Sequence, residues 1–145
     1  MEVTESKVQQ DCFVWLNNNY GMKKHEPRLV MFSVPNEVAM AIRSVLIGLK
    51  LNKKLVDQAV SIVLKKIKNT GFITGVSDTI VLLPNGVTLF VEFKTDKGYQ
   101  SDDQKEFQSR LDNIGHKYYV CRSLESFQEI IESELFPSLS LKKDY

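Results

Sequence analysis

The sequence has little of what marks a secreted, disulfide-stabilised or membrane protein. It holds two cysteines, Cys12 and Cys121, in 145 residues, which is too few for a framework of paired bridges. No uninterrupted apolar run approaches the roughly 18 residues that a membrane span needs. The first ten residues are polar and include acids, unlike a secretory signal. We therefore expect a soluble, cytoplasmic protein with no membrane partner, in which both thiols are free and buried or half-buried.

The chain also lacks internal repeats, low-complexity stretches and a linker rich in proline, glycine or serine. Apolar residues make up 43% of it, which is enough to bury a core and excludes disorder over the whole chain. We expect one domain over residues 1–137, followed by a loose tail over residues 138–145.

An excess of charge of one sign is absent as well, because 19 basic residues stand against 18 acidic ones. The distribution is nevertheless uneven. Residues 50–68 hold six lysines and one acid, whereas residues 69–145 hold eight basic and twelve acidic residues. A local positive face attracts a phosphate backbone whatever the total charge. Lys65, Lys66 and Lys68 are thus candidate DNA contacts, although lysines on an amphipathic helix also serve as plain solvated surface.

The spacing of apolar residues predicts an alternation of helices and strands. In order, we expect a helix from Thr4 to about Asn18, a buried strand over Leu29–Val34, two helices within roughly 37–68, strands over Thr79–Leu83 and Val87–Phe93, a helix after Ser101 that stops at Gly115, a strand over Lys117–Cys121, and a helix from Leu124 to Leu135. Asn85-Gly86 predicts a tight hairpin between its two strands. The fold class is α/β, with a central mixed sheet flanked by helices and a helical insert over about 38–70.

Three charged residues stand in the predicted sheet, where burial disfavours charge. Glu92 and Lys94 are two apart at the end of a strand, so both side chains leave the same face. Pairing about Asn85-Gly86 brings Asp78 beside them. Two adjacent carboxylates repel unless a cation lies between them, and oxygen ligands suit Mg²⁺ or Mn²⁺. Taken alone, the triplet favours a simpler interpretation, a salt bridge that neutralises the end of the sheet.

A set of short motifs favours the metal site over the salt bridge. Asp78, a spacer of thirteen residues and Glu92-Phe93-Lys94 match the pattern of the PD-(D/E)XK nuclease superfamily. Within this superfamily, the chain resembles the VRR-NUC (virus-type replication-repair nuclease) family. The matching segments are Gly75-Val76-Ser77-Asp78, Glu92-Phe93-Lys94, Gly98 to Gln104 with its G-x-x-S-x-x-Q pattern, Glu5 with Gln9, and Pro35-Asn36-Glu37. Ser77 stands where the family usually has proline, which we expect only to shape the turn.

The resemblance implies a restriction-endonuclease-like core and assigns roles to the matching positions. Catalytic residues would be Asp78, Glu92, Lys94 and Gln104. Metal ligands would be Asp78, Glu92, the backbone carbonyl of Phe93 and a carboxylate from the first helix, either Glu5 or its rival Glu2. Tyr99, Tyr118 and Tyr119 are expected to serve packing and the rim of the site rather than base stacking.

The function implied by the resemblance is a Mg²⁺- or Mn²⁺-dependent DNA endonuclease of a bacterial or phage-infected cell. Its expected substrate is branched DNA such as a four-way junction, and its expected assembly is a homodimer. The insert over about 38–70 would then cover one face of the sheet or form the dimer surface. Three alternatives stay open, namely a restriction-type or general nuclease, a non-catalytic DNA-binding module that kept the fold, and a small α/β interaction domain.

Overall fold

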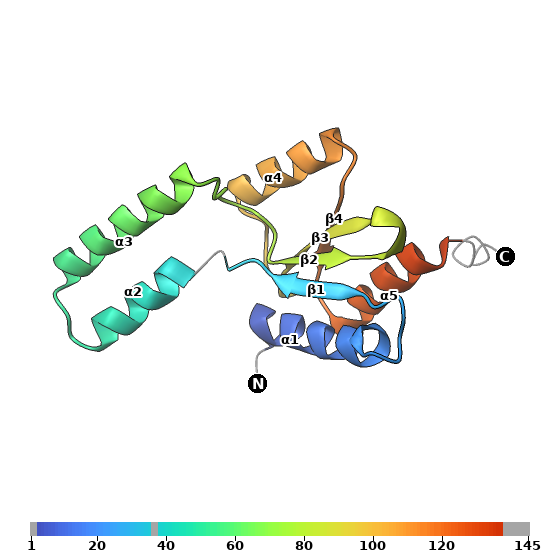
Figure 1. Ribbon diagram of the computed structural model, residues 1–145. Coiled ribbons are helices and arrows are strands. Elements are labelled where there is room, and N and C mark those ends of the chain that lie inside the picture. Colours follow the sequence, from blue (N-terminus) through green and yellow to red (C-terminus); the bar gives the residue numbers. More distant parts are fainter. Residues whose placement is uncertain (1–2, 36–37, 138–145) are drawn as a thin grey trace.

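A computed structural model of the chain describes residues 3–35 and 38–137 (Figure 1). Its elements are α1 (Glu5–Leu16), the π-helical turn η1 (Asn17–Gly21), β1 (Val30–Ser33), α2 (Val38–Gly48), α3 (Lys53–Asn69), β2 (Thr79–Leu82), the 3₁₀ turn η2 (Pro84–Gly86), β3 (Thr88–Phe93), α4 (Asp102–Asn113), β4 (Lys117–Cys121) and α5 (Leu124–Leu135). The expectations for Glu2, for Asn36-Glu37 and for the tail over residues 138–145 lie outside the described residues.

The four strands form one mixed sheet in the order β1-β2-β3-β4. The first three strands pair antiparallel, whereas β3 and β4 are parallel. Asn85 and Gly86 form the turn of the β2–β3 hairpin with φ of 63° and 74°, the left-handed conformation that these two residue types tolerate best. The expected hairpin, mixed sheet and α/β class are confirmed.

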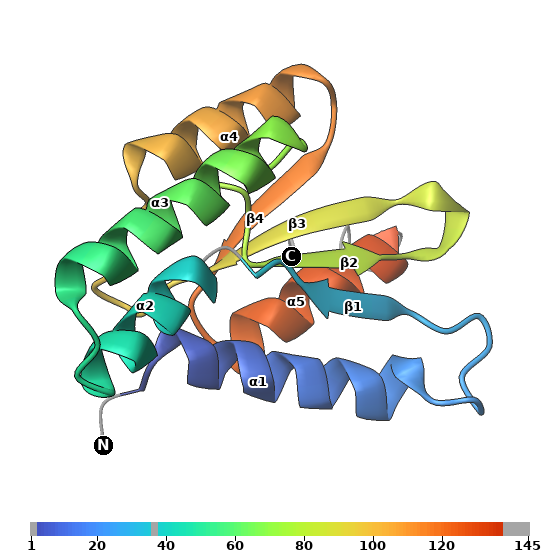
Figure 2. The ribbon, with the colours of Figure 1, turned by 60° about the vertical axis from the view of Figure 1, so that its left-hand side comes forward.

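Helices cover both faces of this sheet (Figures 1 and 2). α1 and α5 pack on one face, and α4 lies on the other. Alternation along β3 sends Leu89, Val91 and Phe93 into the core beneath α1 and α5, where Cys12 and Cys121 are buried as free thiols. Phe90 packs with α4 on the opposite side. Because both faces of β3 are covered, a charged residue at its end is removed from water.

The helix starts follow the capping residues seen in the sequence. The Thr4 side chain accepts a hydrogen bond from the backbone N–H of Lys7 at the start of α1. Ser101 caps α4 in a reciprocal arrangement with Gln104, which fixes where α4 begins. α4 ends at Asn113, just before Gly115, whose φ is 81°.

The expectation of a buried strand over Leu29–Val34 was wrong for most of its residues. β1 is an edge strand, and only Met31 in it is buried. Val30 and Phe32 are 48% and 44% exposed on the other face. An apolar run alone cannot tell an edge strand from a central one, because the difference lies in what covers each face.

The insert does not cover the sheet, so that interpretation was also wrong. α2 and α3 pack mainly on each other and project away from the sheet as a helical hairpin (Figure 1). An ion pair between Arg43 and Asp57 (2.6 Å) joins the two helices. α2 has no buried residue and α3 has one, Val56. Within residues 3–35 and 38–137, no helix is long and apolar enough to cross a membrane.

Candidate active site

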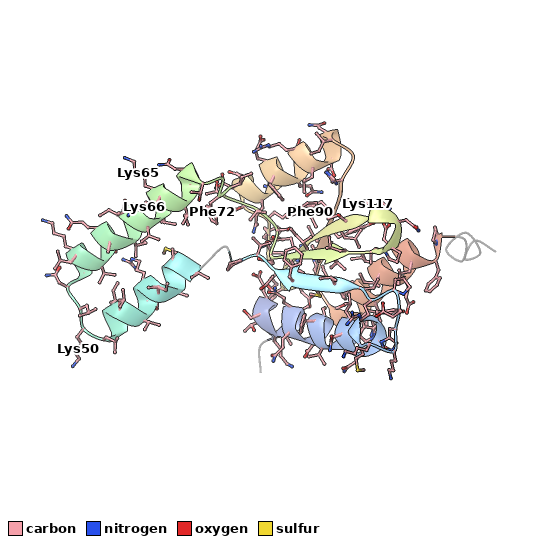
Figure 3. All side chains as sticks on the ribbon, in the orientation of Figure 1. Lys50, Lys65, Lys66, Phe72, Phe90 and Lys117 are labelled. Carbon is pink, nitrogen blue, oxygen red and sulfur yellow. The ribbon has the colours of Figure 1, made fainter. Side chains whose placement is uncertain are left out.

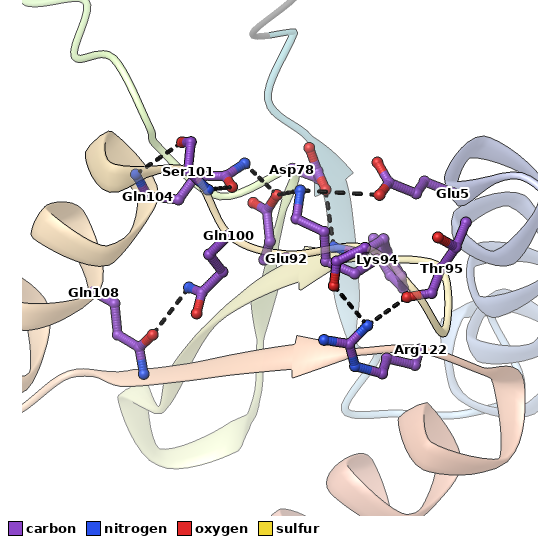
Figure 4. Close-up of polar contacts among 12 residues, drawn as sticks. Glu5, Asp78, Glu92, Lys94, Thr95, Gln100, Ser101, Gln104, Gln108 and Arg122 are labelled. Atoms are coloured by element: carbon purple, nitrogen blue, oxygen red, sulfur yellow. Dashed lines mark hydrogen bonds and ion pairs between the residues drawn. The ribbon is translucent and has the colours of Figure 1, made fainter.

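The candidate residues meet at one end of the sheet (Figure 4). The carboxyl ends of β1, β3 and β4 lie there together with the start of β2, as the strand directions require. The first turns of α1 and α4 reach the same end. Six elements therefore converge, and the hairpin places Asp78 opposite Glu92.

Asp78 is fixed by hydrogen bonds to its two neighbouring strands. Its backbone carbonyl accepts from the N–H of Val34 at 2.7 Å, next to the end of β1. Its carboxylate accepts from the N–H of Phe93 at 2.8 Å. The Ser77 hydroxyl before it is fully buried and donates to the carbonyl of Thr79 at 3.2 Å. Ser77 thus shapes this turn through a hydrogen bond.

Glu92 and Lys94 form a buried ion pair with 2.7 Å between Lys94 Nζ and Glu92 Oε1. Glu92 is fully buried, and burial raises the pKa of its carboxyl group to about 7, with the charge of Asp78 adding to the effect and Lys94 opposing it. Burial alone would lower the pKa of Lys94, but its hydrogen bond to Glu92 and the nearby negative charges raise it above the ordinary value. Each charge of the pair therefore stabilises the other at a buried position where an unpaired charge would be costly.

Gln104 links the first turn of α4 to this pair. Its side-chain nitrogen donates to Glu92 Oε1, and its side-chain oxygen accepts from the N–H of Ser101 at 2.9 Å. The capping arrangement of α4 thus orients the amide that contacts Glu92. The sequence placed Gln104 at the site, and the structure brings it there.

Glu5 reaches the site from α1 but stands at its margin. Its carboxylate lies 4.0 Å from Lys94 Nζ, and its side chain is 43% exposed. Gln9, one turn later, donates to the Thr79 hydroxyl at 2.9 Å and holds α1 against the start of β2. Glu5 is therefore near enough to influence Lys94 while remaining open to solvent.

Two further residues shape the site, although the sequence assigned no role to either. A Cβ atom on Gly75 would lie 2.3 Å from the backbone carbonyl of Asp103, so only glycine lets the segment before Asp78 approach α4 this closely. Arg122, just after β4, donates to the carbonyls of Thr95 and Gly98 and holds the loop that follows Lys94. Gly75 was visible in the motif, but no pattern pointed to Arg122.

Lys65, Lys66 and Lys68 are not brought to this site. All three are exposed on α3, in the helical hairpin that projects from the sheet (Figure 3). Lys50 lies at the other end of the helical hairpin, at the connection between α2 and α3. The lysines of α3 are therefore separated from the carboxylates at the end of the sheet.

The chemistry of the site suits a hard cation. Glu92 Oε2 is buried and has no hydrogen-bond partner among the described residues, which is costly for a carboxylate oxygen unless a cation takes that place. Asp78 and Glu92 offer only oxygen donors. Residues 3–35 and 38–137 contain no cluster of three or more His, Cys, Asp or Glu side chains with metal-binding geometry. A cation here would consequently need backbone, water or phosphate oxygens as well.

A cavity of about 320 Å³ opens beside Asp78 and Glu5. It lies between α1, the end of β1 and the start of α2, and its lining includes Glu5, Gln9, Ser33, Pro35, Ala41 and Asp78. Asp78 and Glu5 thus line an opening on the side that faces the helical hairpin.

The sequence profile of the VRR-NUC domain matches residues 24–125 of the chain. The chain belongs to the VRR-NUC family. This match includes Asp78, Glu92, Lys94 and Gln104, so the convergence at the sheet end lies within a nuclease-family domain. No protein with a curated description matches the chain.

Two solved structures share the fold of this VRR-NUC protein. One is described as a "VRR_NUC domain protein", with a TM-score of 0.58, 18% identity, and coverage of 92% of this chain and 88% of that one. The other, a "VRR_NUC domain", has a TM-score of 0.53 and 17% identity, with coverage of 90% and 97%. The α/β nuclease-like fold expected from the sequence is thereby confirmed.

Proposed function

We propose that this protein is a Mg²⁺- or Mn²⁺-dependent DNA endonuclease that hydrolyses phosphodiester bonds at the end of β3. The observation that carries the proposal is the environment of Glu92. Its carboxylate is fully buried, receives Lys94 and Gln104 on one oxygen, and has no partner on the other among the described residues. A cation beside that oxygen would offset the free-energy cost of burying it.

Asp78 and Glu92 would hold the cation, and the carbonyl of Phe93 is the third ligand that the family resemblance suggests. Glu5, whose carboxylate lies 4.0 Å from Lys94 Nζ, would add a carboxylate through water. When bound, the cation would supply positive charge at the phosphate and promote ionisation of an attacking water. The role of the protein is to hold these oxygens in place with hydrogen bonds from the sheet and from α4.

Lys94 has two tasks in this proposal. Its ammonium group favours the ionised form of Glu92, since the hydrogen bond and positive charge of Lys94 lower the pKa that burial raises. It is also a compact donor that can orient the attacking water or a phosphate oxygen. Gln104 would keep the Glu92 carboxylate in one orientation while Lys94 turns to the substrate.

The exposed lysines of α3 would bind the DNA backbone away from the scissile phosphate. Lys65, Lys66 and Lys68 lie on one helix end and are not neutralised by any ion pair among the described residues. Contacts of this kind give affinity without sequence preference.

We further propose that the enzyme acts on branched DNA as a homodimer. One site cuts one strand, so resolving a four-way junction takes two sites related by a two-fold axis. The α2–α3 hairpin supplies a candidate interface, because four residues spaced at helical intervals leave apolar side chains in solvent: Val38, Ile42, Val45 and Leu49.

Cleavage of matched single-stranded, duplex, flap and four-way substrates tests the proposal. We expect activity with Mg²⁺ or Mn²⁺, no activity in excess EDTA, and binding without cleavage in Ca²⁺. Full cleavage in EDTA would refute the metal requirement. Equal rates on linear duplex and four-way DNA would favour a general nuclease, and binding without cleavage in every metal would favour a DNA-binding module.

A further inference from the structure

Tyr99 is the most solvent-exposed of the large apolar and aromatic side chains among the described residues, at 88%. It was expected to pack or to line the rim of the site, and it does not pack. An aromatic ring left in water is a large apolar surface with an unused stacking face. Tyr99 lies in the chain between Lys94 and Gln104, two residues of the candidate site. Its ring therefore bears on which kind of DNA the site binds.

The backbone on both sides of Tyr99 is held firmly. Before it, the Gly98 carbonyl accepts from Arg122 at 2.9 Å, and the Gly98 N–H donates to the carbonyl of Thr95 at 3.0 Å. After it, the Gln100 side chain donates to Gln108 at 3.0 Å, and Ser101 begins α4. Tyr99 is therefore an exposed ring on a fixed support, whereas a ring at the tip of a mobile loop would lose entropy on binding.

This support stands at the rim of the active site. A Cβ atom on Gly98 would lie 3.2 Å from the Glu5 carboxylate, so the residue before Tyr99 borders a carboxylate at the margin of the site. Gln104, at the other end of the same segment, contacts Glu92. Lys97 is exposed two residues before Tyr99 and offers a positive charge for a flanking phosphate. An aromatic ring beside a cation is the usual arrangement for contacting single-stranded nucleic acid.

We propose that Tyr99 stacks on an unpaired base of the DNA bound at this site and favours substrates that present one. Inside a duplex both faces of a base are covered by its neighbours, so a fixed ring can stack only at a branch point, flap, gap or frayed end. Selection of non-duplex DNA would follow from this contact without any hydrogen bond to a base edge. The inference rests on the proposed function, since it assumes that DNA occupies the site.

The test uses two probes of equal length, a single-stranded oligonucleotide with 2-aminopurine at every third position and the corresponding duplex. Both are titrated in Ca²⁺, so that binding is measured without cleavage. We expect stacking to quench the 2-aminopurine fluorescence of the single strand with wild-type protein and with Tyr99→Phe, but not with Tyr99→Ala. Removal of the ring should weaken single-strand binding roughly tenfold, the order of one base–aromatic stack, and leave duplex binding nearly unchanged.

Phe136→Ala is the matched control, because Phe136 is an exposed aromatic (47%) just after α5. It should change neither quenching nor affinity, and thermal unfolding should show that every variant is folded. Unchanged quenching and affinity in Tyr99→Ala, while wild type cleaves DNA, would overturn this inference alone. Stacking without cleavage in Mg²⁺ or Mn²⁺ would support it and overturn the proposed hydrolysis. Failure of wild type to bind either probe would overturn both.

Discussion

The carboxylate of Asp78 accepts a hydrogen bond from the backbone N–H of Phe93, with 2.8 Å between Asp78 Oδ2 and the Phe93 nitrogen. This bond continues the β2–β3 hairpin one step beyond its last paired residues, Thr79 and Val91. The acceptor is the side-chain carboxylate of Asp78, whereas a paired strand would supply a backbone carbonyl. The Asp78 carboxylate is consequently fixed by the sheet itself.

The first prediction concerns these two carboxylates. Glu92→Ala or Asp78→Ala should lower the cleavage rate by at least about 100-fold, because each removes a negative oxygen ligand that neighbouring groups hold in place. DNA binding should persist or tighten, since the negative charge near the phosphate falls. Cleavage kinetics and binding in Ca²⁺ separate the two effects. A wild-type rate in Glu92→Ala would exclude this residue from catalysis.

The second prediction concerns the buried ion pair. Lys94→Met should lower the free energy of unfolding by roughly 3 kcal/mol without divalent cations, because Glu92 is left buried without its positive partner. Adding Mg²⁺ or Mn²⁺ should raise the melting temperature of this variant more than that of wild type, since the cation replaces the missing charge. Calorimetry with and without metal measures both. An equal metal response in the two proteins would argue against a cation between Asp78 and Glu92.

The third prediction compares two glycines with nearly the same backbone conformation. Gly75 and Gly86 have φ of 77° and 74°. Gly86→Ala should cost about 1 kcal/mol, because its Cβ meets open space and only the left-handed conformation is strained. Gly75→Ala should cost roughly 3 kcal/mol or more and slow cleavage, since its Cβ would collide with the backbone of Asp103. Equal unfolding free energies would show that this close approach is unimportant.

Local signals in the sequence were enough to predict most of the elements and the central part of the site. Asn85-Gly86 predicted the hairpin, and the hairpin in turn predicted that Asp78 lies beside Glu92, because strand pairing leaves little freedom there. Ser101 predicted the start of α4, which positions Gln104. These inferences succeeded because each depends on residues that are neighbours in sequence or across one turn.

What the sequence could not predict depends on packing between distant segments. The exposure of Phe32 follows from β1 lying at the edge of the sheet, and an apolar run does not encode strand order. The hydrogen bonds of Arg122 to the loop after Lys94 span 24 and 27 residues and have no sequence pattern. Tyr99 was expected to pack or to line the rim, because an aromatic residue between two motifs gives no sign of how exposed it is.

The fourth prediction concerns the basic surface of α3. Replacing Lys65, Lys66 and Lys68 with alanine should weaken binding similarly for every DNA sequence, because lysine–phosphate interactions carry no sequence information. The slope of log affinity against log salt should flatten by roughly 0.9 for each phosphate of duplex DNA that is no longer neutralised by a lysine. Lys23→Ala/Lys24→Ala, which removes two positive charges at exposed positions before β1, is the control for loss of charge elsewhere. An unchanged slope in the α3 variant would leave these lysines as plain solvated surface.

The last prediction is that the α2–α3 hairpin joins two copies of the chain. Wild type should sediment at micromolar concentration with about twice the 16.6 kDa mass of one chain. Ile42→Glu/Val45→Glu places two charges on the exposed apolar stripe of α2 and should yield monomers, because charge at the centre of an apolar interface is unpaired and desolvated. Ile114→Glu, at an exposed apolar position after α4, should leave the mass unchanged.

The activity of the same variants tests what the dimer is for. The Ile42→Glu/Val45→Glu monomer should still nick one strand, since Asp78, Glu92 and Lys94 come from a single chain, but it should not make paired cuts on opposed strands of a four-way junction. A cruciform plasmid measures this directly, because paired cuts within one binding event give linear product and single cuts give nicked circles. We expect linear product from wild type and Ile114→Glu, and nicked circles from the α2 variant. A wild-type protein that sediments as a monomer, or an α2 variant that still produces linear DNA, would contradict dimeric action and favour a general nuclease.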